Sequence, residues 1–218
     1  MLVPNVPHSG VPVVRSARQG AAVLSPVACI IRTAMRIGLI SDTHVPVAAK
    51  ELWPQIFEEF RGAGSVAGGK VDLIMHGGDL MTPDVIDWLE EIAPVMAVSG
   101  NGDYTGWERS IPPQDVRLSE SKVLVVDSMR IGLVHDFQLP EAPPLRTIDG
   151  LMAHFFGGPV NVIVRGSTHA AEITTVKGVL IVNPGSPTFP NHQTVRLGTI
   201  GFLDIEYGRV RPSIVQLQ

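Results

Sequence analysis

Three short apolar segments in the first half of the chain constrain the fold most, because each has the composition of a strand buried on both faces. They span Met35–Ser41, Val71–Met75 and Val95–Ser99. Segments with apolar residues at helical spacing separate them, at Lys50–Arg61 and at residues 82–92. Such alternation predicts parallel strands joined by right-handed crossovers. We therefore expect an α/β fold.

The expected helix starts carry prolines. Pro54 is expected to fix the start of the first helix near Trp53, and Thr82 is expected to cap the second, with Pro83 at its first position. The pattern in the second half of the chain predicts instead a hairpin, a helix at residues 145–156 and several short strands. The hairpin and strands are expected at Lys122–Val126, Arg130–Val134, Val160–Arg165, Glu172–Val176, Val179–Val182, Thr199–Glu206 and Val210–Gln216.

Composition limits the classes of function. Of the 218 residues, 44% are hydrophobic and 17% charged, which supports a packed core. The net charge of −4 lacks the basic footprint of nucleic-acid binding, so we expect no nucleic-acid partner. Cys29 is the single cysteine, which excludes an intrachain disulfide and favours the cytoplasm. No apolar run has the length of a membrane span, so we expect no membrane partner.

Residues 1–34 are expected to lie outside the fold, as a disordered extension or a start-site artefact. They are rich in Pro, Val, Ala and Ser and contain no acidic residue. Met35 opens the first clear strand, so residues 35–218 are expected to form a single domain.

Polar side chains follow each of the first three strands. Ligands of open α/β sheets bind beyond the carboxyl ends of strands, so Asp42, His44, Asp79 and Asn101 should converge there. Asp42 and His44 occupy alternate positions and would point the same way on an extended backbone. Carboxylate, amide and imidazole groups together suit divalent ions such as Mn²⁺, Fe²⁺ or Zn²⁺.

Two more histidines follow later strands, His135 after residues 130–134 and His169 after residues 160–165. A single histidine in such a place is more often structural than a ligand. The ordered set of five clusters at strand ends is what indicates a metal site.

The motifs and their order resemble those of the YfcE-like branch of the calcineurin-like metallophosphoesterases. The sequence motifs of that branch are SDTH, GD, GNCD, HGH, GHTH and NPGS. The similarity runs from Met35 to about the C-terminus. It implies two mixed β-sheets packed as a sandwich and flanked by helices. The matching segments are Ser41–His44, Gly78-Asp79, Gly100–Asp103, His135–Phe137, Gly166–His169 and Asn183–Ser186.

The resemblance implies a two-metal site. The first ion would be held by Asp42, His44 and His169, Asp79 would bridge both ions, and the second ion would be held by Asn101 and His135. Mn²⁺ is the expected metal, with Fe, Zn or Ni as alternatives. The implied reaction is hydrolysis of a small phosphodiester by in-line attack of a metal-bound hydroxide. Asp79, Asn101 and Asp103 would act in catalysis, Asp103 by orienting the site.

Several positions depart from the family pattern. Ser167 stands where a histidine usually completes the second ion's ligands, so we expect weaker binding there. Asp136, usually glycine, is either a replacement carboxylate or, as we prefer, a solvated turn residue. Phe137 replaces a histidine that contacts phosphate. Gly102 stands where relatives have cysteine or, further away, a histidine that protonates the leaving group.

His76 and His192 are candidates for the neighbourhood of the site. We prefer to interpret His76 as a packing residue at a strand end and His192 as a loop residue.

A different class of function stays open: a scaffold with little or no activity that binds a protein partner, as the retromer subunit of eukaryotic endosomes does. Ser167 and Phe137 favour it. The presence of the complete first ligand set, together with Asn101, favours the enzyme. A nuclease ranks third, because the chain is acidic.

Overall fold

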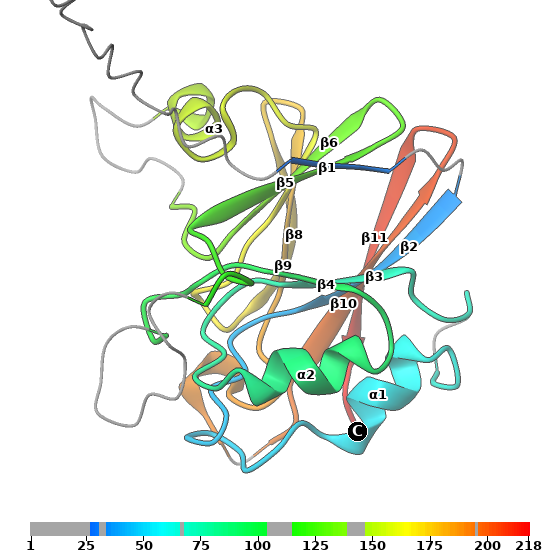
Figure 1. Ribbon diagram of the computed structural model, residues 1–218, viewed down its shortest axis with the longest axis vertical. Coiled ribbons are helices and arrows are strands. Elements are labelled where there is room, and N and C mark those ends of the chain that lie inside the picture. Colours follow the sequence, from blue (N-terminus) through cyan, green and yellow to red (C-terminus); the bar gives the residue numbers. More distant parts are fainter. Residues whose placement is uncertain (1–26, 31–33, 66–67, 104–114, 139–146, 195) are drawn as a thin grey trace, which may run out of the picture.

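A computed structural model describes residues 27–30, 34–65, 68–103, 115–138, 147–194 and 196–218. Two β-sheets pack face to face, and helices lie on their outer faces (Figure 1). The expected sandwich of two mixed sheets is therefore confirmed.

The five-stranded sheet contains the parallel strands of the first half of the chain. Its central strand β2 pairs in parallel with β3, and β3 with β4, while β10 runs antiparallel to β2 and to β11. In spatial order the strands are β11 (Arg209–Gln216), β10 (Thr199–Glu206), β2 (Ala34–Ile40), β3 (Leu73–His76) and β4 (Val95–Ala97).

The six-stranded sheet comes mainly from the second half. The predicted hairpin is its β5–β6 pair, and β7 pairs in parallel with both β6 and β9. In spatial order the strands are β1 (Val27–Ile30), β5 (Ser121–Val126), β6 (Met129–Val134), β7 (Val162–Val164), β9 (Val179–Pro184) and β8 (Ala171–Val176).

Strand β1 lies before residue 35, where the sequence predicts that the domain begins. Val27–Ile30 pairs in parallel with β5, from Val123 to Val126, so these four residues belong to the sheet although they precede residue 35. The physical reason is that the outer edge of β5 offers backbone donors and acceptors, which another strand satisfies. The rest of residues 1–33 lies outside the described part of the chain.

The apolar core has three layers. Between the sheets, Ile37 and Leu39 of β2 meet Leu124 and Ile131 of the other sheet. On the outer face of the five-stranded sheet, residues of α1 (Pro54–Phe60) and α2 (Asp84–Glu90) form a second layer. Helix α3 (Ile148–Phe156) forms the third layer on the outer face of the six-stranded sheet. Burial on both faces explains why the strands of the first half are continuously apolar.

The helix ends follow local chemistry. Pro54 occupies the first turn of α1, as expected. Helix α2 begins one residue later than predicted, because Pro83 rather than Thr82 is its N-cap; the Thr82 hydroxyl accepts a hydrogen bond from the Asp84 N–H at 3.4 Å. Helix α3 is capped by the Thr147 hydroxyl, and residues 145–146 of its predicted span lie outside the described residues.

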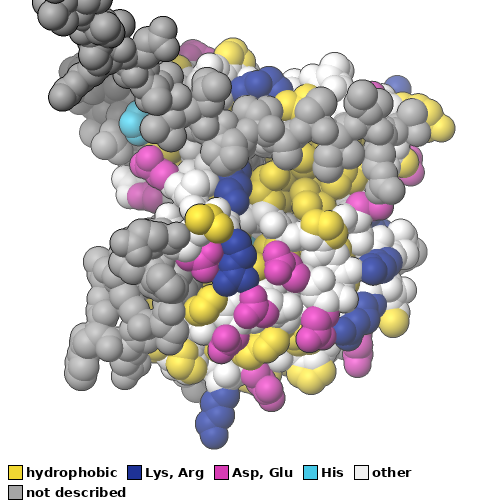
Figure 2. Space-filling model, viewed as in Figure 1, with side chains coloured by type: hydrophobic (Ala, Val, Ile, Leu, Met, Phe, Trp, Pro, Cys, Tyr) yellow, Lys and Arg dark blue, Asp and Glu magenta, His cyan; other side chains and the backbone are white. Residues whose placement is uncertain are grey.

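The surface shows both signs of charge. On the face in Figure 2, Lys and Arg side chains are interspersed with Asp and Glu. Among the described residues, no helix combines the length and the apolar character needed to cross a membrane.

Candidate metal centre

The predicted site residues follow the ends of strands in both sheets. Asp42 follows β2, Asp79 follows β3 and Asn101 follows β4, all in the five-stranded sheet. His135 follows β6 and His169 follows β7 in the six-stranded sheet. The centre therefore lies where the two sheets present the carboxyl ends of their strands, as the topology of α/β sheets leads one to expect.

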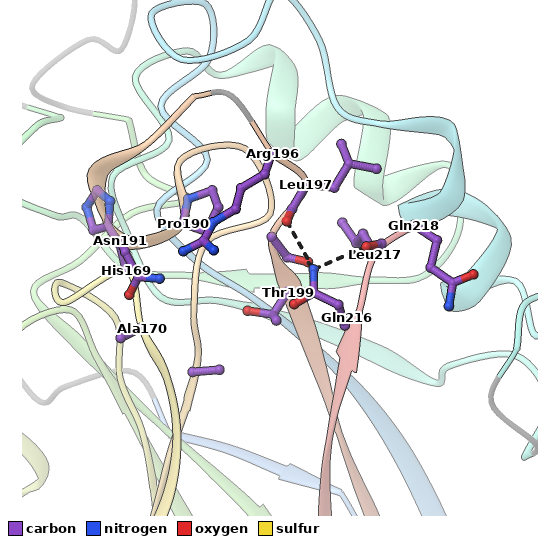
Figure 3. Close-up of a pocket in the computed structure, with 12 residues that line it drawn as sticks. His169, Ala170, Pro190, Asn191, Arg196, Leu197, Thr199, Gln216, Leu217 and Gln218 are labelled. Carbon is purple, nitrogen blue, oxygen red and sulfur yellow. Dashed lines mark hydrogen bonds between the residues drawn. The ribbon is translucent and has the colours of Figure 1, made fainter.

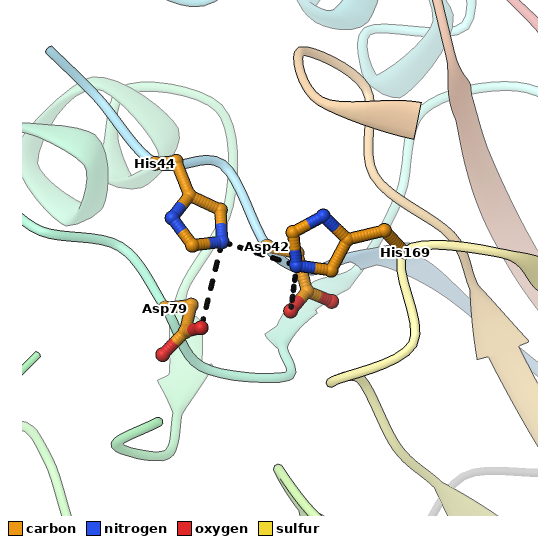
Figure 4. A group of neighbouring side chains, drawn as sticks. All are labelled: Asp42, His44, Asp79 and His169. Atoms are coloured by element: carbon orange, nitrogen blue, oxygen red, sulfur yellow. Dashed lines mark hydrogen bonds and ion pairs between the residues drawn. The ribbon is translucent and has the colours of Figure 1, made fainter. Parts of the chain in front are cut away.

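Four side chains form one compact group (Figure 4). Asp42, His44, Asp79 and His169 each offer one ligand atom, and these atoms lie within 4.8 Å of one another. The Nε2 atom of His44 is 3.4 Å from Asp79 Oδ2 and 3.2 Å from His169 Nε2. His169 Nε2 is 3.5 Å from Asp42 Oδ1. Two carboxylates and two imidazoles at this spacing suit a divalent cation.

The backbone that presents this group is not extended. Asp42, His44, Asp79 and His169 have φ angles of 54°, 44°, 56° and 57°, in the left-handed region that non-glycine residues rarely adopt. The prediction that alternate positions on an extended backbone align Asp42 with His44 was therefore wrong in its reason. The two side chains converge because the chain turns sharply at both residues.

Hydrogen bonds from a distant segment hold this turn in place. The Ser186 hydroxyl donates to the carbonyl of Asp42, and the Thr188 hydroxyl donates to the carbonyl of Thr43, each at 2.6 Å. The His44 N–H donates to the carbonyl of Asp79 at 3.0 Å. Strained backbone persists only where surrounding contacts fix it, and such positions cluster at functional sites.

A second group shares Asp79 with the first. His135 Nε2 lies 3.5 Å from Asp79 Oδ2 and 3.2 Å from Asn101 Oδ1. Because Asp79 Oδ2 is also 3.4 Å from His44 Nε2, one carboxylate oxygen faces an imidazole from each group. Asp79 Oδ2 thus lies within 3.5 Å of the imidazoles of both His44 and His135.

The protonation of the imidazoles fits metal binding. His135 Nδ1 donates to the carbonyl of Gly77 at 2.7 Å, and His169 Nδ1 donates to the carbonyl of Phe189 at 3.0 Å. A ring whose Nδ1 carries the proton can ligate a metal through Nε2, and the Nε2 atoms of His135 and His169 both face the centre. Burial lowers the pKa of His44 to about 4 and also lowers the pKa of His169, which favours the neutral rings that ligate metals.

The carboxylate of Asp42 is deeply buried. Burial raises the pKa of Asp42 to about 7, although the Ser41 hydroxyl and the Ser167 N–H donate to it. No described Lys or Arg forms an ion pair with Asp42 or Asp79. The centre is therefore a set of acceptors without a cationic side chain, and a divalent ion would supply the missing positive charge.

Asp103 acts on the backbone and not on the ligand atoms. Its carboxylate is fully buried and accepts hydrogen bonds from the N–H groups of Asp79, Gly100 and Met81 at 3.0, 2.8 and 2.8 Å. Burial raises the pKa of this carboxyl group. Asp103 therefore ties the loop after β3 to the loop after β4, which places Asp79 next to Asn101.

The glycines beside Asp103 allow these loops to approach closely. A Cβ atom at Gly100 would lie 2.1 Å from Asp79 Oδ1, so no larger residue fits without displacement. The Gly102 N–H donates to the same oxygen at 2.6 Å. The backbone at Gly102 thus orients Asp79, although the position offers no side chain that could donate a proton.

The other departures from the family pattern have structural explanations. The Ser167 N–H donates to both oxygens of Asp42, at 3.1 and 3.2 Å, so this residue supports the first group through its backbone. Asp136 is exposed and accepts a hydrogen bond from Gln138, as a solvated turn residue does. Phe137 is fully buried and stacks on Phe156, with ring centroids 6.2 Å apart, so it belongs to the core beneath α3.

Both additional histidines lie beside the centre. His76 is fully buried; its Nδ1 accepts from the Gly78 N–H at 3.1 Å and its Nε2 faces the Thr43 hydroxyl at 3.2 Å. Both ring nitrogens are thus occupied in fixing the loops. The exposed ring of His192 packs on His169, with centroids 4.1 Å apart.

Sequence reasoning missed several supporting residues. Ser41 bonds the Asp42 carboxylate, and Phe189 both accepts from His169 and packs its ring against His44 at 5.5 Å. The available signal was the Asn183–Ser186 segment, which matches a family motif. Its last residue reaches the site, because the Ser186 hydroxyl donates to the carbonyl of Asp42.

Two cavities border the predicted ligand residues. One, of about 660 Å³, borders His169 and includes Asn191, Arg196 and Thr199 in its walls (Figure 3). The amide of Gln216 fixes part of that wall by donating to the carbonyls of Leu197, Gly198 and Leu217. The other cavity, of about 240 Å³, borders Asn101 and His135.

Comparison with known proteins agrees with this geometry. Residues 35–208 match the calcineurin-like phosphoesterase superfamily domain. A probable metallophosphoesterase of Methanothermobacter thermautotrophicus is 34% identical over 158 residues, covering 72% of this chain and 79% of that protein. This chain belongs to the calcineurin-like phosphoesterase superfamily, and its relatives are named as metallophosphoesterases.

Solved structures share the fold. Vacuolar protein sorting 29 from Cryptosporidium parvum superposes with a TM-score of 0.61 at 18% identity, covering 85% of this chain and 99% of that one. A structure described as a novel archaeal phosphodiesterase gives a TM-score of 0.52 at 22% identity, covering 83% of this chain and all of that one. At these identities the likeness concerns the fold alone.

Proposed function

We propose that this protein is a metal-dependent phosphodiesterase that hydrolyses a small phosphodiester by in-line displacement at phosphorus. The observation that carries the proposal is the position of Asp79, whose Oδ2 atom faces His44 on one side and His135 on the other, at 3.4 and 3.5 Å. A carboxylate shared by two groups of ligands is an arrangement that can hold two adjacent divalent ions.

The residues present fit such ions. Asp42, His44 and His169 would hold the first, Asn101 and His135 would hold the second, and Asp79 would contact both. Divalent ions bound there would lower the pKa of a water molecule and neutralise negative charge on the phosphate. Mn²⁺ accepts this mixture of carboxylate, amide and imidazole ligands. With no imidazole at Ser167, the second ion should bind more weakly than the first.

The chain's own residues would perform the remaining tasks. Asp103 and the Gly102 N–H fix the orientation of Asp79, and the Gly77 and Phe189 carbonyls fix two imidazole rings. Gly102 offers no proton donor to the leaving group. Substrates with good leaving groups, such as p-nitrophenolate, should therefore react faster than alkyl esters.

The test is hydrolysis of bis(p-nitrophenyl) phosphate and of p-nitrophenyl phosphate, with and without Mn²⁺. We expect Mn²⁺-dependent turnover of the diester, faster than that of the monoester, and its loss in Asp79→Asn. Asp127→Asn is the matched control, because Asp127 is exposed in the β5–β6 turn at a φ of 57°, which asparagine tolerates. Full activity of Asp79→Asn would contradict the assignment.

The second candidate is a scaffold that binds a protein partner and has little activity. Ser167, which removes one imidazole from the centre, is the feature that favours it. A folded protein that hydrolyses neither substrate with Mn²⁺, Zn²⁺, Fe²⁺ or Ni²⁺ would count against the enzyme, and a bound protein partner would then establish this alternative.

A further inference from the structure

The smaller cavity lies against the second group of the centre. Its volume is about 240 Å³, and Asn101 and His135 form one part of its wall. Glu120, Asp136 and Phe155 form other parts of the wall. A phosphate held at Asn101 and His135 would therefore border this cavity.

The size of the cavity restricts what it holds. Pockets for drug-sized ligands measure about 300–1,000 Å³, so this cavity suits a group of a few heavy atoms and not a nucleoside. The apolar side chains of Val134, Leu151 and Phe155 line it together with the polar groups. Such a mixture favours a compact group with an apolar surface.

The charge of the cavity restricts the group further. Glu120 and Asp136 are exposed, and neither forms an ion pair with a Lys or Arg of the described residues. Within the described residues, the Asp136 carboxylate accepts a hydrogen bond from the neutral amide of Gln138, at 3.1 Å. No described Lys or Arg lines this cavity. On the side of the cavity formed by Glu120 and Asp136, these carboxylates would repel a negatively charged substituent and attract a positively charged one.

The aromatic wall selects among cations. Phe155 is half-buried, with His154 packed at 4.7 Å and Phe137 at 6.2 Å, so its ring has a fixed place in the wall. Aromatic faces combined with carboxylates bind substituted ammonium groups through cation–π and ionic attraction. The other cavity differs in sign, because Arg196 borders it (Figure 3).

We propose that the cavity beside Asn101 and His135 is a binding site for one ester substituent of the substrate, and that it takes a substituent carrying a compact ammonium group. The inference rests on the proposed phosphodiesterase function and narrows its substrate class to diesters of amino alcohols.

The test compares two diesters that differ only in charge. One is p-nitrophenyl phosphorylcholine, and the other is p-nitrophenyl 3,3-dimethylbutyl phosphate, in which carbon replaces the ammonium nitrogen. Both release p-nitrophenolate, so kcat/KM is measured by one assay with Mn²⁺. We expect a preference of about tenfold for the choline ester, since two solvent-exposed charge interactions together supply about that much.

The double variant Glu120→Gln/Asp136→Asn should reduce the preference to about twofold or less. Glu90→Gln is the matched control, because Glu90 is an exposed glutamate at the end of α2 and its replacement changes the net charge without touching the cavity. It should keep the preference of the wild type. Equal kcat/KM for the two diesters in the wild type, or an unchanged preference in the double variant, would overturn the proposal.

A measurement of binding separates this inference from the proposed function. Saturation-transfer NMR with choline and with 3,3-dimethylbutanol needs no turnover. Transfer to choline alone, weakened in the double variant, would support the cavity assignment even if bis(p-nitrophenyl) phosphate is not hydrolysed. Absence of transfer to choline in a protein that does hydrolyse this diester would refute the cavity assignment and leave the phosphodiesterase standing.

Discussion

Replacement of Asp103 tests whether this buried carboxylate positions the metal centre. Its oxygens accept three backbone N–H groups, from Asp79 and Gly100 at Oδ2 and from Met81 at Oδ1. A buried donor without a partner costs about 1–3 kcal/mol, so Asp103→Ala leaves donors worth roughly 3–9 kcal/mol unsatisfied. Relief of the buried carboxylate's own desolvation offsets part of this. We expect a loss of about 3–5 kcal/mol in the free energy of unfolding.

Asp103→Asn should destabilise the protein less than Asp103→Ala does. With its oxygen at the Oδ2 position the amide keeps the bonds from Asp79 and Gly100, while its NH₂ group faces the Met81 N–H and loses one bond. The expected loss is about 1–3 kcal/mol. In Asp103→Ala the Mn²⁺ affinity should fall about 10–100-fold, as is typical when a group that orients a metal ligand is removed. In Asp103→Asn it should fall less, because Asp79 stays in place.

Urea unfolding in EDTA measures the stabilities, and calorimetric titration with Mn²⁺ measures the affinities. Glu90→Ala provides the control, because Glu90 is an exposed carboxylate on α2 whose loss should change stability by about 0.5 kcal/mol or less. A loss below about 1 kcal/mol in Asp103→Ala, or equal losses in the two Asp103 variants, would refute the reasoning.

Three further predictions follow from the centre. His44→Ala should remove the first ion and abolish Mn²⁺-dependent hydrolysis, as checked by elemental analysis beside the assay; activity with full metal content would contradict the site. Ser167→His should lower the Mn²⁺ concentration at which a second ion binds, and an unchanged titration would show that residue 167 does not reach that ion. Burial lowers the pKa of His76 from 6.5 to about 3. As the pH decreases from about 6.5 toward 3, the unfolded state therefore binds a proton that the folded state does not. The free energy of unfolding falls over this range. Between pH 7 and pH 5, His76 should account for about 2 kcal/mol of the decrease in the free energy of unfolding. The decrease in His76→Asn should be smaller by that amount, as measured by urea unfolding at the two pH values.

The sequence predicted the parts that depend on local pattern and on topology. Apolar strands alternating with helices predicted the parallel order β2, β3 and β4, and this order brings Asp42, Asp79 and Asn101 to one edge. The family motifs implied how His135 and His169 share metal ions with these residues. Hydrophobic periodicity alone does not give the order of the strands in the second half of the chain.

The remainder depended on tertiary contacts. The left-handed backbone at Asp42 and His44 cannot be inferred from an Asp-Thr-His tripeptide, since it is imposed by hydrogen bonds from Ser186 and Thr188, over 140 residues away. The burial of Phe137 likewise depends on α3, which packs over it. Strand β1 was missed because only the free edge of β5 gives its residues a partner.

Burial is the largest influence on the pKa values of Asp42 and His44. Burial raises the pKa of Asp42 to about 7 and lowers that of His44 to about 4, so in each case the charged form is disfavoured. For Asp42 a shift of about three units corresponds to roughly 4 kcal/mol against the carboxylate. A divalent ion reverses the preference at the carboxylate and leaves it unchanged at the imidazole, whose neutral form is the ligand. The same burial therefore makes the ion-free carboxylate of Asp42 unfavourable, and a divalent ion bound beside it would offset this cost.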